Sequence, residues 1–514
     1  MLSLCKNISA AKTVIFHFGV IIYPFAFKYQ ISIMPIVARY RTVPCEVVYN
    51  LPMVRTRIAP SPTGEDLHIG SVHTALINWA YAKKYSGQFI VRIEDTDRER
   101  LVKGSEEKML DTLKKYGLDY DEGPDKEGLC GPYRQSERLE TYEIYVNELL
   151  EKGVAYYCFC SKDRLDKLRK QQVVEKKMPR YDKYCLKNVK NGKERAGSGE
   201  KYVIRLNVKP KQTIEFEDLI RGKISFQSEN IDDQILIKSD GYPTYHLAVV
   251  VDDHLMKITH VIRGEEWISS TPKHIILYEA FGWEKPLYAH TPLLRDKNKA
   301  KLSKRRNPVW ASWYIDQGYL PRAILNYLAL MGWSHPKQKE IFTIDEFIKV
   351  FDLKDMSPVG PAFDPVKLEW LSGEHIRILE NEDLKSRIAS FIGDKYNIEI
   401  VSKTIPLIKE RIKKLSEYLP LCEFYFKEPE KYEMDLKTHK NIIEKIHSEL
   451  SKIEDWKGNK IGEVMLVLAE KEKIKISEFF MILRVAISGK KITPPLNESM
   501  EILGKKECLK RLNL

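Results

Sequence analysis

The fold of this chain is decided by residues 54–94, VRTRIAPSPTGEDLHIGSVHTALINWAYAKKYSGQFIVRIE. The stretch begins with a short β-rich run, 54–58, which ends at the turn sequence APSPTG. Apolar residues then recur at helical spacing from Ser71 and stop at Gly87, a residue type that commonly ends helices. The run FIVRI at 89–93 is apolar enough for a buried parallel strand. The stretch therefore predicts a strand–helix–strand unit.

This unit predicts a ligand site at the ends of its strands. Open α/β sheets bind ligands beyond the carboxyl ends of their strands, so residues 57–70 and Glu94 should border one crevice. The helix N-terminus beside His68 should attract a phosphate there, because free N–H groups and the helix dipole favour anions.

The composition bounds the class of protein. With 514 residues the chain is long enough for about two to four domains. It has 84 Lys+Arg against 72 Asp+Glu, a formal net charge of +12, which fits nucleic-acid binding and ordinary solubility equally well. The 8 cysteines are scattered, so a reducing intracellular compartment is favoured over a disulfide framework.

Residues 1–52 differ from the rest of the chain. They contain one acidic residue, Glu46, and an apolar run at 14–27 that is too short to span a membrane. A transit peptide, a signal peptide and translation assigned from an upstream start are the competing interpretations. We favour the upstream start, because Met53 stands immediately before the first predicted strand. We therefore expect a disordered extension and a cytoplasmic protein, with an organelle as the alternative if this segment is a transit peptide.

The following sequence predicts a second half of the same fold. Residues 150–240 resemble an insertion, because their strand-like runs lie in a polar, looped context. These runs are 156–160, 202–206, 214–216 and 235–238. An apolar element from Tyr245 ends on two carboxylates, and a strand at 259–262 and a helix at 269–281 follow. Arg263, beyond the carboxyl end of that strand, should point into the same crevice.

The last third of the chain has the apolar spacing of helices from Leu320 onward. The predicted fold class is therefore α/β. We expect a Rossmann-type doubly wound parallel-sheet catalytic domain at 53–340, with the insertion at about 150–240, and an all-α domain at 341–514.

The residues near the crevice suit phosphate chemistry. No Walker A motif or GxGxxG pattern is present, so neither a P-loop nor a nicotinamide site is indicated. His68 and the loop KAKLSKRR at 299–306 could instead hold a triphosphate from two sides, although such a charge run is more often a solvated face. Displacement of pyrophosphate needs mainly positioning and neutralisation of charge, which His68 and Lys304 could supply.

Charged residues at strand ends suit a second ligand. Arg57 and Arg263 could bind one carboxylate through paired hydrogen bonds, although an arginine at a strand end is more often a surface ion-pair partner. Glu94 could hold an ammonium group. Together these three residues describe a site for an acidic amino acid.

Six motifs then occur in order along the chain. They are RIAPSPTG with HIG (57–64 and 68–70), RIEDTD (92–97), YHLA (245–248), VVDDHLM (250–256), IRGEEW (262–267) and KLSKR (301–305). Their order and content resemble the bacterial-type glutamyl-tRNA synthetases, which are class I aminoacyl-tRNA synthetases. The likeness is strong over residues 53–377 and extends to the C-terminal helices only in type.

The resemblance implies a reaction in two steps. L-glutamate would be activated by ATP, with Mg²⁺, to glutamyl-adenylate, and then transferred to the 3′-terminal adenosine of tRNA-Glu. The resemblance also implies that the insertion binds the acceptor stem and that the C-terminal helices bind the anticodon. We expect a monomer with no membrane partner.

The resemblance implies roles for individual residues as well. The catalytic residues carried over by motif are His68, Gly70, Lys301 and Lys304. The residues implied in ATP binding are Thr63, His68, Gly70 and Lys304. Those implied in glutamate binding are Arg57, Ser61, Glu94, Tyr245 and Arg263. Two positions depart from the family: Ser71 stands where a second histidine is frequent, and Val249 where some members have asparagine.

A cysteine cluster predicts a metal site in the insertion. Cys158, Cys160, Tyr181 and Cys185 resemble the zinc knob of some family members. Zn²⁺ takes four ligands and thiolates suit it. Lys187 stands where some members have a histidine ligand, so Tyr181 would have to be the fourth ligand. The alternative is a metal-free site in which the cysteines are small buried residues.

Other functions remain open at this point. A non-catalytic tRNA-binding scaffold on the same fold would not need the full set of site residues. A truncated relative that glutamylates a tRNA base would lack the helical C-terminal part, and a glutaminyl enzyme would carry a β-barrel there. The sequence does not decide whether tRNA-Gln is charged besides tRNA-Glu, although aromatic and basic residues of the tail could stack on unpaired bases.

Overall fold

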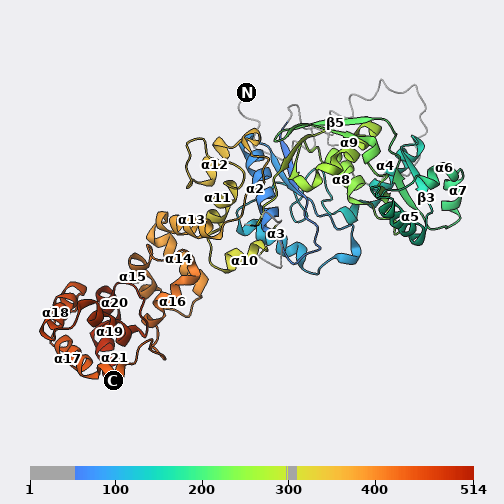
Figure 1. The fold of residues 1–514 in the computed structure, drawn as a ribbon. Coiled ribbons are helices and arrows are strands. Elements are labelled where there is room, and N and C mark those ends of the chain that lie inside the picture. The colour runs from blue at the N-terminus through green and yellow to red at the C-terminus, as the bar shows by residue number, and fades with distance from the viewer. Residues whose placement is uncertain (1–52, 297, 299–301, 303–308, 514) are drawn as a thin grey trace, which may run out of the picture. The chain divides into compact units, whose positions relative to one another are not determined.

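The computed structural model describes residues 53–513, apart from 297, 299–301 and 303–308 (Figure 1). The predictions for residues 1–52, Lys301 and Lys304 therefore lie outside the described residues. Within the described ranges, no helix combines the length and the apolar character that are needed to cross a bilayer.

The predicted strand–helix–strand unit is confirmed. Strands β1 (Arg55–Ile58) and β2 (Gln88–Val91) are parallel, and α2 (Ile69–Lys84) connects them. The buried face of α2 includes Val72, Ala75 and Leu76. Gly87 allows the return to β2, because a Cβ atom there would lie 2.0 Å from the carbonyl oxygen of Val54.

The second half of the α/β part follows the same pattern. The apolar run from Tyr245 is helix α8 (Tyr245–Leu255), which precedes β8 (His260–Gly264). Helix α9 (Thr271–Phe281) then leads to β9 (Leu287–Thr291), which is parallel to β8. The predicted strand and helix at 259–281 are therefore confirmed.

The two halves meet where β1 runs beside β8. The backbone N–H of Thr259 donates to the carbonyl oxygen of Arg55 at 3.0 Å, and further along Arg57 lies beside Ile262. Both strands therefore run in the same direction, and the carboxyl ends of β1, β2, β8 and β9 lie at one edge, as the doubly wound fold requires.

The segment 150–240 contributes strands to two sheets. Strands β3 (Ala155–Cys158), β4 (Val203–Leu206) and β7 (Ile235–Ile237) form an antiparallel sheet of their own. Strand β5 (Thr213–Asp218) instead pairs in parallel with β9 and antiparallel with β6 (Gly222–Gln227), which gives the order β6-β5-β9-β8. The sequence does not predict β6, because none of its residues is buried.

Helices connect and cover these strands (Figure 1). Before and within the segment 150–240 they are α3 (Ser105–Lys115), α4 (Leu139–Glu151), α5 (Lys162–Val174), α6 (Tyr184–Asn188) and α7 (Gly192–Gly197).

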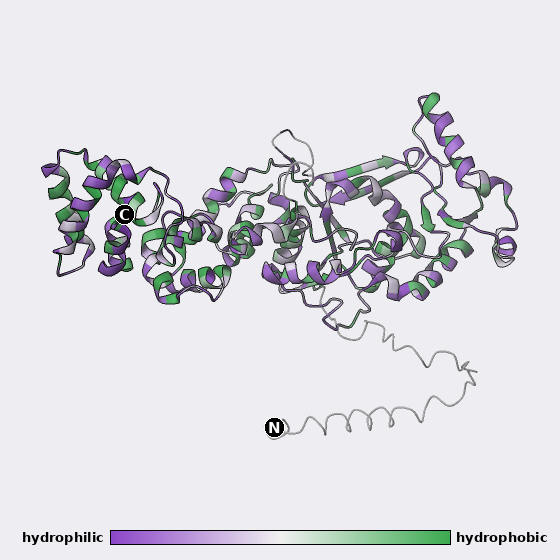
Figure 2. Cartoon of the chain, turned by 90° about the horizontal axis from the view of Figure 1, so that it is seen from below, coloured by the Kyte–Doolittle hydropathy of each residue, from purple (hydrophilic) through white to green (hydrophobic). Residues whose placement is uncertain are grey.

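The regular structure of the described chain from Ala311 onward is helical, which confirms the helices predicted from Leu320 onward. Their bounds are α10 (Ala311–Asp316), α11 (Pro321–Ala329), α12 (Ile344–Val350), α13 (Pro365–Ile378), α14 (Asn381–Ile392), α15 (Ile398–Ile408), α16 (Tyr418–Cys422), α17 (Lys440–Ser451), α18 (Gly458–Lys471), α19 (Ile476–Ser488), α20 (Leu496–Leu503) and α21 (Lys505–Leu512). Figure 2 shows both hydrophilic and hydrophobic residues along these helices, the pattern of amphipathic helices that bury one face.

The core of the α/β part continues beyond residue 340, where the sequence places the end of the catalytic domain. Trp333, Phe347 and Phe351 belong to the same buried cluster as the residues of α2, and the cluster extends to Leu371 in α13. Separate buried clusters hold the following helices together.

Candidate active site

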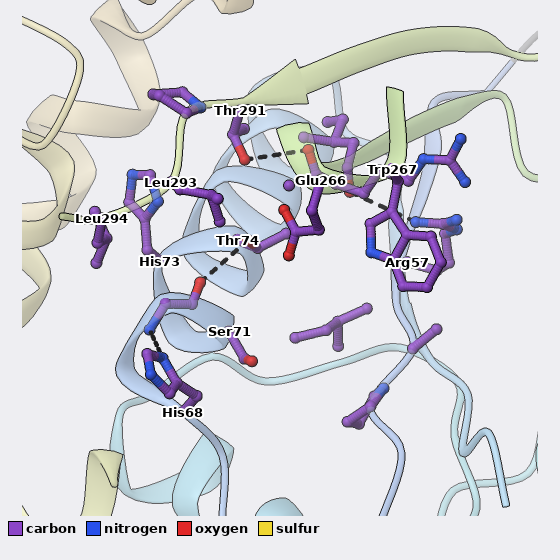
Figure 3. A pocket seen from close by; sticks show the side chains of 18 of the residues that line it. Arg57, His68, Ser71, His73, Thr74, Glu266, Trp267, Thr291, Leu293 and Leu294 are labelled. Carbon is purple, nitrogen blue, oxygen red and sulfur yellow. Dashed lines mark hydrogen bonds between the residues drawn. The ribbon is translucent and has the colours of Figure 1, made fainter. Parts of the chain in front are cut away.

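A cavity of about 350 Å³ lies at the carboxyl ends of β1 and β8 (Figure 3). The predicted site residues that line it are Arg57, His68, Gly70, Glu94, Tyr245 and Arg263. Ser61 and Thr63 belong to the loop between β1 and α2 and do not line the cavity. Lys301 and Lys304 are outside the described residues. The structure thus brings most of the predicted carboxylate, ammonium and phosphate contacts to one cavity.

His68 caps the N-terminus of α2 at the wall of this cavity (Figure 3). Its Nδ1 accepts a hydrogen bond from the backbone N–H of Gly70 at 3.0 Å. A neutral His68 ring therefore carries its proton on Nε2, which is a hydrogen-bond donor. A Cβ atom at position 70 would lie 3.2 Å from Nδ1, so glycine permits this close cap.

The amides at the start of α2 are not free, which corrects the sequence argument for the phosphate site. Besides Gly70, the N–H of Ile69 donates to the carbonyl oxygen of Val309 at 2.7 Å, and that of Ser71 donates to the carbonyl oxygen of His68 at 2.7 Å. The return of the chain at Val309 satisfies a donor that the sequence leaves open. Attraction of an anion to this end therefore depends on the His68 ring and the helix dipole.

Arg57 is held by a buried carboxylate from α8. Its Nε and Nη2 atoms donate to the two oxygens of Asp253 at 3.2 and 3.1 Å. Asp253 also accepts from Nη1 of Arg92 at 2.8 Å, and Nε of Arg92 lies 3.6 Å from Asp252. These side chains are almost completely buried. The charge of Arg57 is therefore compensated within the protein, while the guanidinium keeps a fixed place in the cavity wall.

Glu94 has the chemistry of an ammonium acceptor. One of its oxygens accepts from Nη2 of Arg92 at 3.2 Å, and its side chain is 12% exposed. Burial raises the pKa of Glu94 to about 7, although the neighbouring Arg92 and Arg57 oppose the shift. The carboxyl group therefore changes its charge near neutral pH.

Arg263 differs from Arg57 in the charge of its partners. Its Nη1 donates to the Tyr245 hydroxyl at 3.0 Å and lies 3.2 Å from Nδ1 of His274. Its Nη2 donates to the Thr271 hydroxyl at 2.8 Å, and its Nε to Nε2 of His290 at 3.1 Å. Burial keeps both histidines neutral, because it lowers the pKa of His290 to about 4 and that of His274 well below its ordinary value. Among the described residues, no carboxylate pairs with this guanidinium.

Tyr245 completes this wall of the cavity. Its ring lies against that of Trp267, with the ring centroids 4.1 Å apart, and both residues line the cavity. Trp267 follows β8 in the short helical turn Glu265–Ser270. The ring contact holds the Tyr245 hydroxyl beside Arg263.

Several residues that support the site are not predicted from the sequence. They are Arg92, Asp218, Asp253, His274 and His290. The two aspartates that follow the apolar run 245–251 were one available signal, because an acid beside fully apolar residues is buried only with a cationic partner. The histidines carry no comparable signal in the sequence.

The predicted zinc ligands also come together. The Sγ atoms of Cys158, Cys160 and Cys185 all lie within 4.8 Å of one another. The Tyr181 hydroxyl oxygen lies 3.4 Å from Sγ of Cys158 and 3.2 Å from Sγ of Cys160. Thiolates on one tetrahedral Zn²⁺ are about 3.8 Å apart, so the thiol spacing fits this metal. Tyr181 fits less well, because burial raises the pKa of its hydroxyl and a metal ligand would need the ionised form.

Comparison with known proteins places the chain among enzymes of one kind. Residues 53–370 match the family model "tRNA synthetases class I (E and Q), catalytic domain", and residues 376–514 match "Anticodon binding domain". A glutamate–tRNA ligase of Acidothermus cellulolyticus is 44% identical over 479 residues, which cover 89% of this chain and 94% of the relative. One of Finegoldia magna is 44% identical over 485 residues, which cover 90% of this chain and 98% of the relative.

Solved structures agree with these relatives. A glutamate tRNA ligase of Elizabethkingia meningosepticum, in complex with its amino acid, superposes with a TM-score of 0.80 at 35% identity, covering 90% of this chain and 98% of that chain. A glutamate-tRNA synthetase of Elizabethkingia anophelis gives a TM-score of 0.79 at 35% identity, with 90% and 99% coverage. The predicted fold class and family resemblance are therefore confirmed.

Proposed function

The chain belongs to the class I tRNA synthetases of the glutamate and glutamine type, and from this membership we propose that it is a glutamate–tRNA ligase. It joins L-glutamate to tRNA by ATP-dependent formation of glutamyl-adenylate and transfer to the 3′-terminal adenosine. The observation that carries this assignment is Arg263, a buried guanidinium in the cavity wall whose acceptors in the described part of the chain are all neutral. A substrate carboxylate provides the missing opposite charge.

In the first step the side-chain carboxylate of glutamate lies against Arg263, with Tyr245 and Arg57 in the same wall, and its ammonium group lies against Glu94. An oxygen of the substrate's α-carboxylate attacks the α-phosphorus of ATP, and pyrophosphate leaves. Nε2 of His68 donates to the phosphates as negative charge develops on them. Ser61, Thr63, Gly70, Lys301 and Lys304 keep their predicted roles as part of this proposal.

ATP would bind with Mg²⁺, which would supply positive charge to the phosphate oxygens. Glu266 lines the same cavity, and carboxylate oxygens are of the ligand type that Mg²⁺ prefers. In the second step the tRNA acceptor end reaches the adenylate along the segment 150–240, while the C-terminal helices bind the anticodon. Cytoplasmic location and a monomeric state are further parts of the proposal.

Side-by-side charging assays test this function. Purified protein is given tRNA-Glu and tRNA-Gln separately, with labelled glutamate and with glutamine as a competing amino acid. Charging of tRNA-Glu by glutamate, insensitive to glutamine, is the expected result, and charging of tRNA-Gln would identify a non-discriminating enzyme. If neither tRNA accepts glutamate, the chain is a non-catalytic tRNA-binding protein and the proposal is wrong.

Lys304→Ala is expected to lower aminoacylation more than about tenfold, because the loop cation neutralises charge on the leaving pyrophosphate. The measurement is ATP–pyrophosphate exchange in the presence of glutamate, which isolates the first step. Arg306→Ala, in the same basic run, is the control for a loss of loop charge alone. Unchanged exchange in Lys304→Ala would contradict the role assigned to Lys304.

The kcat/KM for glutamate is expected to fall as the pH is lowered through about 7, by up to about tenfold per pH unit. The raised pKa of Glu94 means that the carboxylate, the form that binds an ammonium group, is lost below this pH and fully present above it. Glu94→Gln should show lower activity and should lack this acidic limb. The same limb in both proteins would assign the titration to another group.

The isolated protein is expected to contain zinc at close to one equivalent. Elemental analysis of protein purified without added metal provides the measurement. Cys160→Ser should lose most of the metal, since it removes one of the clustered thiols, whereas Cys508→Ser, which changes a cysteine of a separate buried cluster, should retain it. Metal-free wild-type protein would favour the alternative of buried structural cysteines.

A further inference from the structure

Behind Arg263 lies a buried pair of residues, Asp218 and His290. Nδ1 of His290 lies 2.6 Å from Oδ2 of Asp218, and Nε2 of the same ring accepts from Nε of Arg263 at 3.1 Å. The side chains of both residues of the pair are completely inaccessible to solvent. A continuous chain of hydrogen bonds therefore runs from a carboxylate, through an imidazole, to the guanidinium that faces the cavity.

The strand pairing of β5 with β9 places this pair. Asp218 is the last residue of β5 and is opposite Tyr288 of β9, while His290 is the next residue of β9 on the same side. The backbone N–H of His290 also donates to Asp218, at 3.1 Å. The other oxygen of Asp218 accepts from the backbone N–H groups of Ile220 and Arg221, both at 3.0 Å. Both carboxylate oxygens are thus needed as acceptors.

These contacts determine which ring nitrogen of His290 carries the proton. Nδ1 faces a carboxylate oxygen, which can only accept, so the proton resides on Nδ1. Nε2 then has a lone pair and faces Nε of Arg263, which can only donate. The opposite tautomer would set two N–H groups against each other at Arg263. Burial lowers the pKa of His290 to about 4, so the ring is neutral at physiological pH.

We propose that Asp218 and His290 are a positioning pair for the amino-acid site, which holds Arg263 toward the substrate's side-chain carboxylate without neutralising its charge. The inference rests on the proposed function and adds two residues that do not line the cavity. A carboxylate in direct contact with Arg263 would pair with it, as Asp253 pairs with Arg57, and would compete with the substrate. The imidazole instead fixes the direction of the guanidinium through a neutral acceptor. The pair thereby supports selection of glutamate over its uncharged amide.

Substitutions that separate the hydrogen bond of His290 with Arg263 from its hydrogen bond with Asp218 test this inference. His290→Leu removes the acceptor for Arg263 and is expected to raise KM for glutamate about 30-fold, with KM for ATP changed less than about twofold. His290→Gln offers a carbonyl oxygen to Arg263 without any tautomer, and is expected to restore KM for glutamate to within about fivefold of wild type. Equal effects of Leu and Gln would overturn the inference.

The role of Asp218 is tested by a double-mutant cycle. Asp218→Asn presents an amide N–H to Nδ1 of His290, which favours the wrong tautomer, and is expected to raise KM for glutamate about tenfold or more. In the His290→Gln background the same change should add less than about twofold, because no tautomer remains to be set. A purely structural role of Asp218 in the 218–221 turn would give the same penalty in both backgrounds and would overturn the inference.

The ring itself provides a readout that is independent of activity. Nitrogen chemical shifts of histidine distinguish a protonated from an unprotonated ring nitrogen. The chain has 12 histidines, and the signals that disappear in His290→Gln are those of His290. A proton on Nδ1 in wild type that moves to Nε2 in Asp218→Asn is the expected result, and a proton on Nε2 in wild type would contradict the inference.

Two controls separate this inference from the proposed function. Glutamate charging by wild-type protein in the same assay decides the function, whatever the variants do. Asp121→Asn is the matched control for an aspartate that accepts from a backbone N–H in the α/β part, that of Phe89, away from the cavity. It should keep wild-type KM values for glutamate and ATP.

Discussion

Arg263→Ala is expected to lower kcat/KM for glutamate about 10³-fold, the largest effect on catalysis of any single change to the described site. The substitution leaves the side-chain carboxylate of the substrate without its cation, in a wall where Tyr245, Thr271 and His274 have lost their common donor. Unpaired polar groups on both sides of the contact increase the loss. KM for ATP should change little, because the described partners of Arg263 include neither His68 nor Gly70.

The variant Arg263→Lys separates the contribution of the positive charge at this position from that of the hydrogen-bond geometry. Arg263→Lys keeps the positive charge but offers only three N–H donors from one atom, too few for the four side chains that Arg263 contacts and the substrate carboxylate together. Its kcat/KM should lie between those of wild type and Arg263→Ala. ATP–pyrophosphate exchange with glutamate as the varied substrate gives these values, and Arg134→Ala, which removes a partly exposed arginine paired with Glu106, is the control. Wild-type kinetics in Arg263→Ala would place the substrate carboxylate elsewhere.

The positions of Arg57, Glu94 and Arg263 could be anticipated because each follows from one local rule. Each residue lies at or just beyond the carboxyl end of a short buried strand, and in a doubly wound sheet the carboxyl ends of strands converge. Their location at one cavity therefore needs only the strand assignment and the parallel topology. His68 and Gly70 could be anticipated for the same reason, because they begin the helix that follows the first strand.

The supporting residues could not be anticipated, because their contacts join segments that are far apart in the sequence. Asp218 and His290 are separated by 72 positions and meet only because β5, within a segment that resembles an insertion, pairs with β9. The sequence of neither strand reveals that it pairs with the other, or in which register. The prediction of free amides at the start of α2 is wrong for a similar reason. The chain returns at Val309, whose carbonyl oxygen accepts from the N–H of Ile69.

Asp253→Ala is expected to lower the free energy of unfolding by about 3–5 kcal/mol, the typical cost of removing one partner from a buried ion pair. Asp253 lies between Arg57 and Arg92, and all three side chains are nearly inaccessible to solvent. Burial alone would raise the pKa of Asp253, but the two guanidinium groups lower it, so they stabilise its charged form. Urea unfolding followed by tryptophan fluorescence measures the change, and Asp111→Ala, on an exposed helical pair, should stay within about 0.5 kcal/mol of wild type.

Loss of Asp253 should also move the titration of Glu94, and the direction of this shift distinguishes electrostatic coupling from loss of packing. The negative charge of Asp253 raises the pKa of Glu94, while Arg92 and Arg57 lower it. In Asp253→Asn, which keeps the volume of the side chain, the two arginines act on Glu94 without this opposition. The acidic limb of kcat/KM for glutamate, expected near pH 7 in wild type, should therefore shift to lower pH. A limb that stays in place while stability falls would mean that Asp253 supports the fold without setting the charge of the ammonium site.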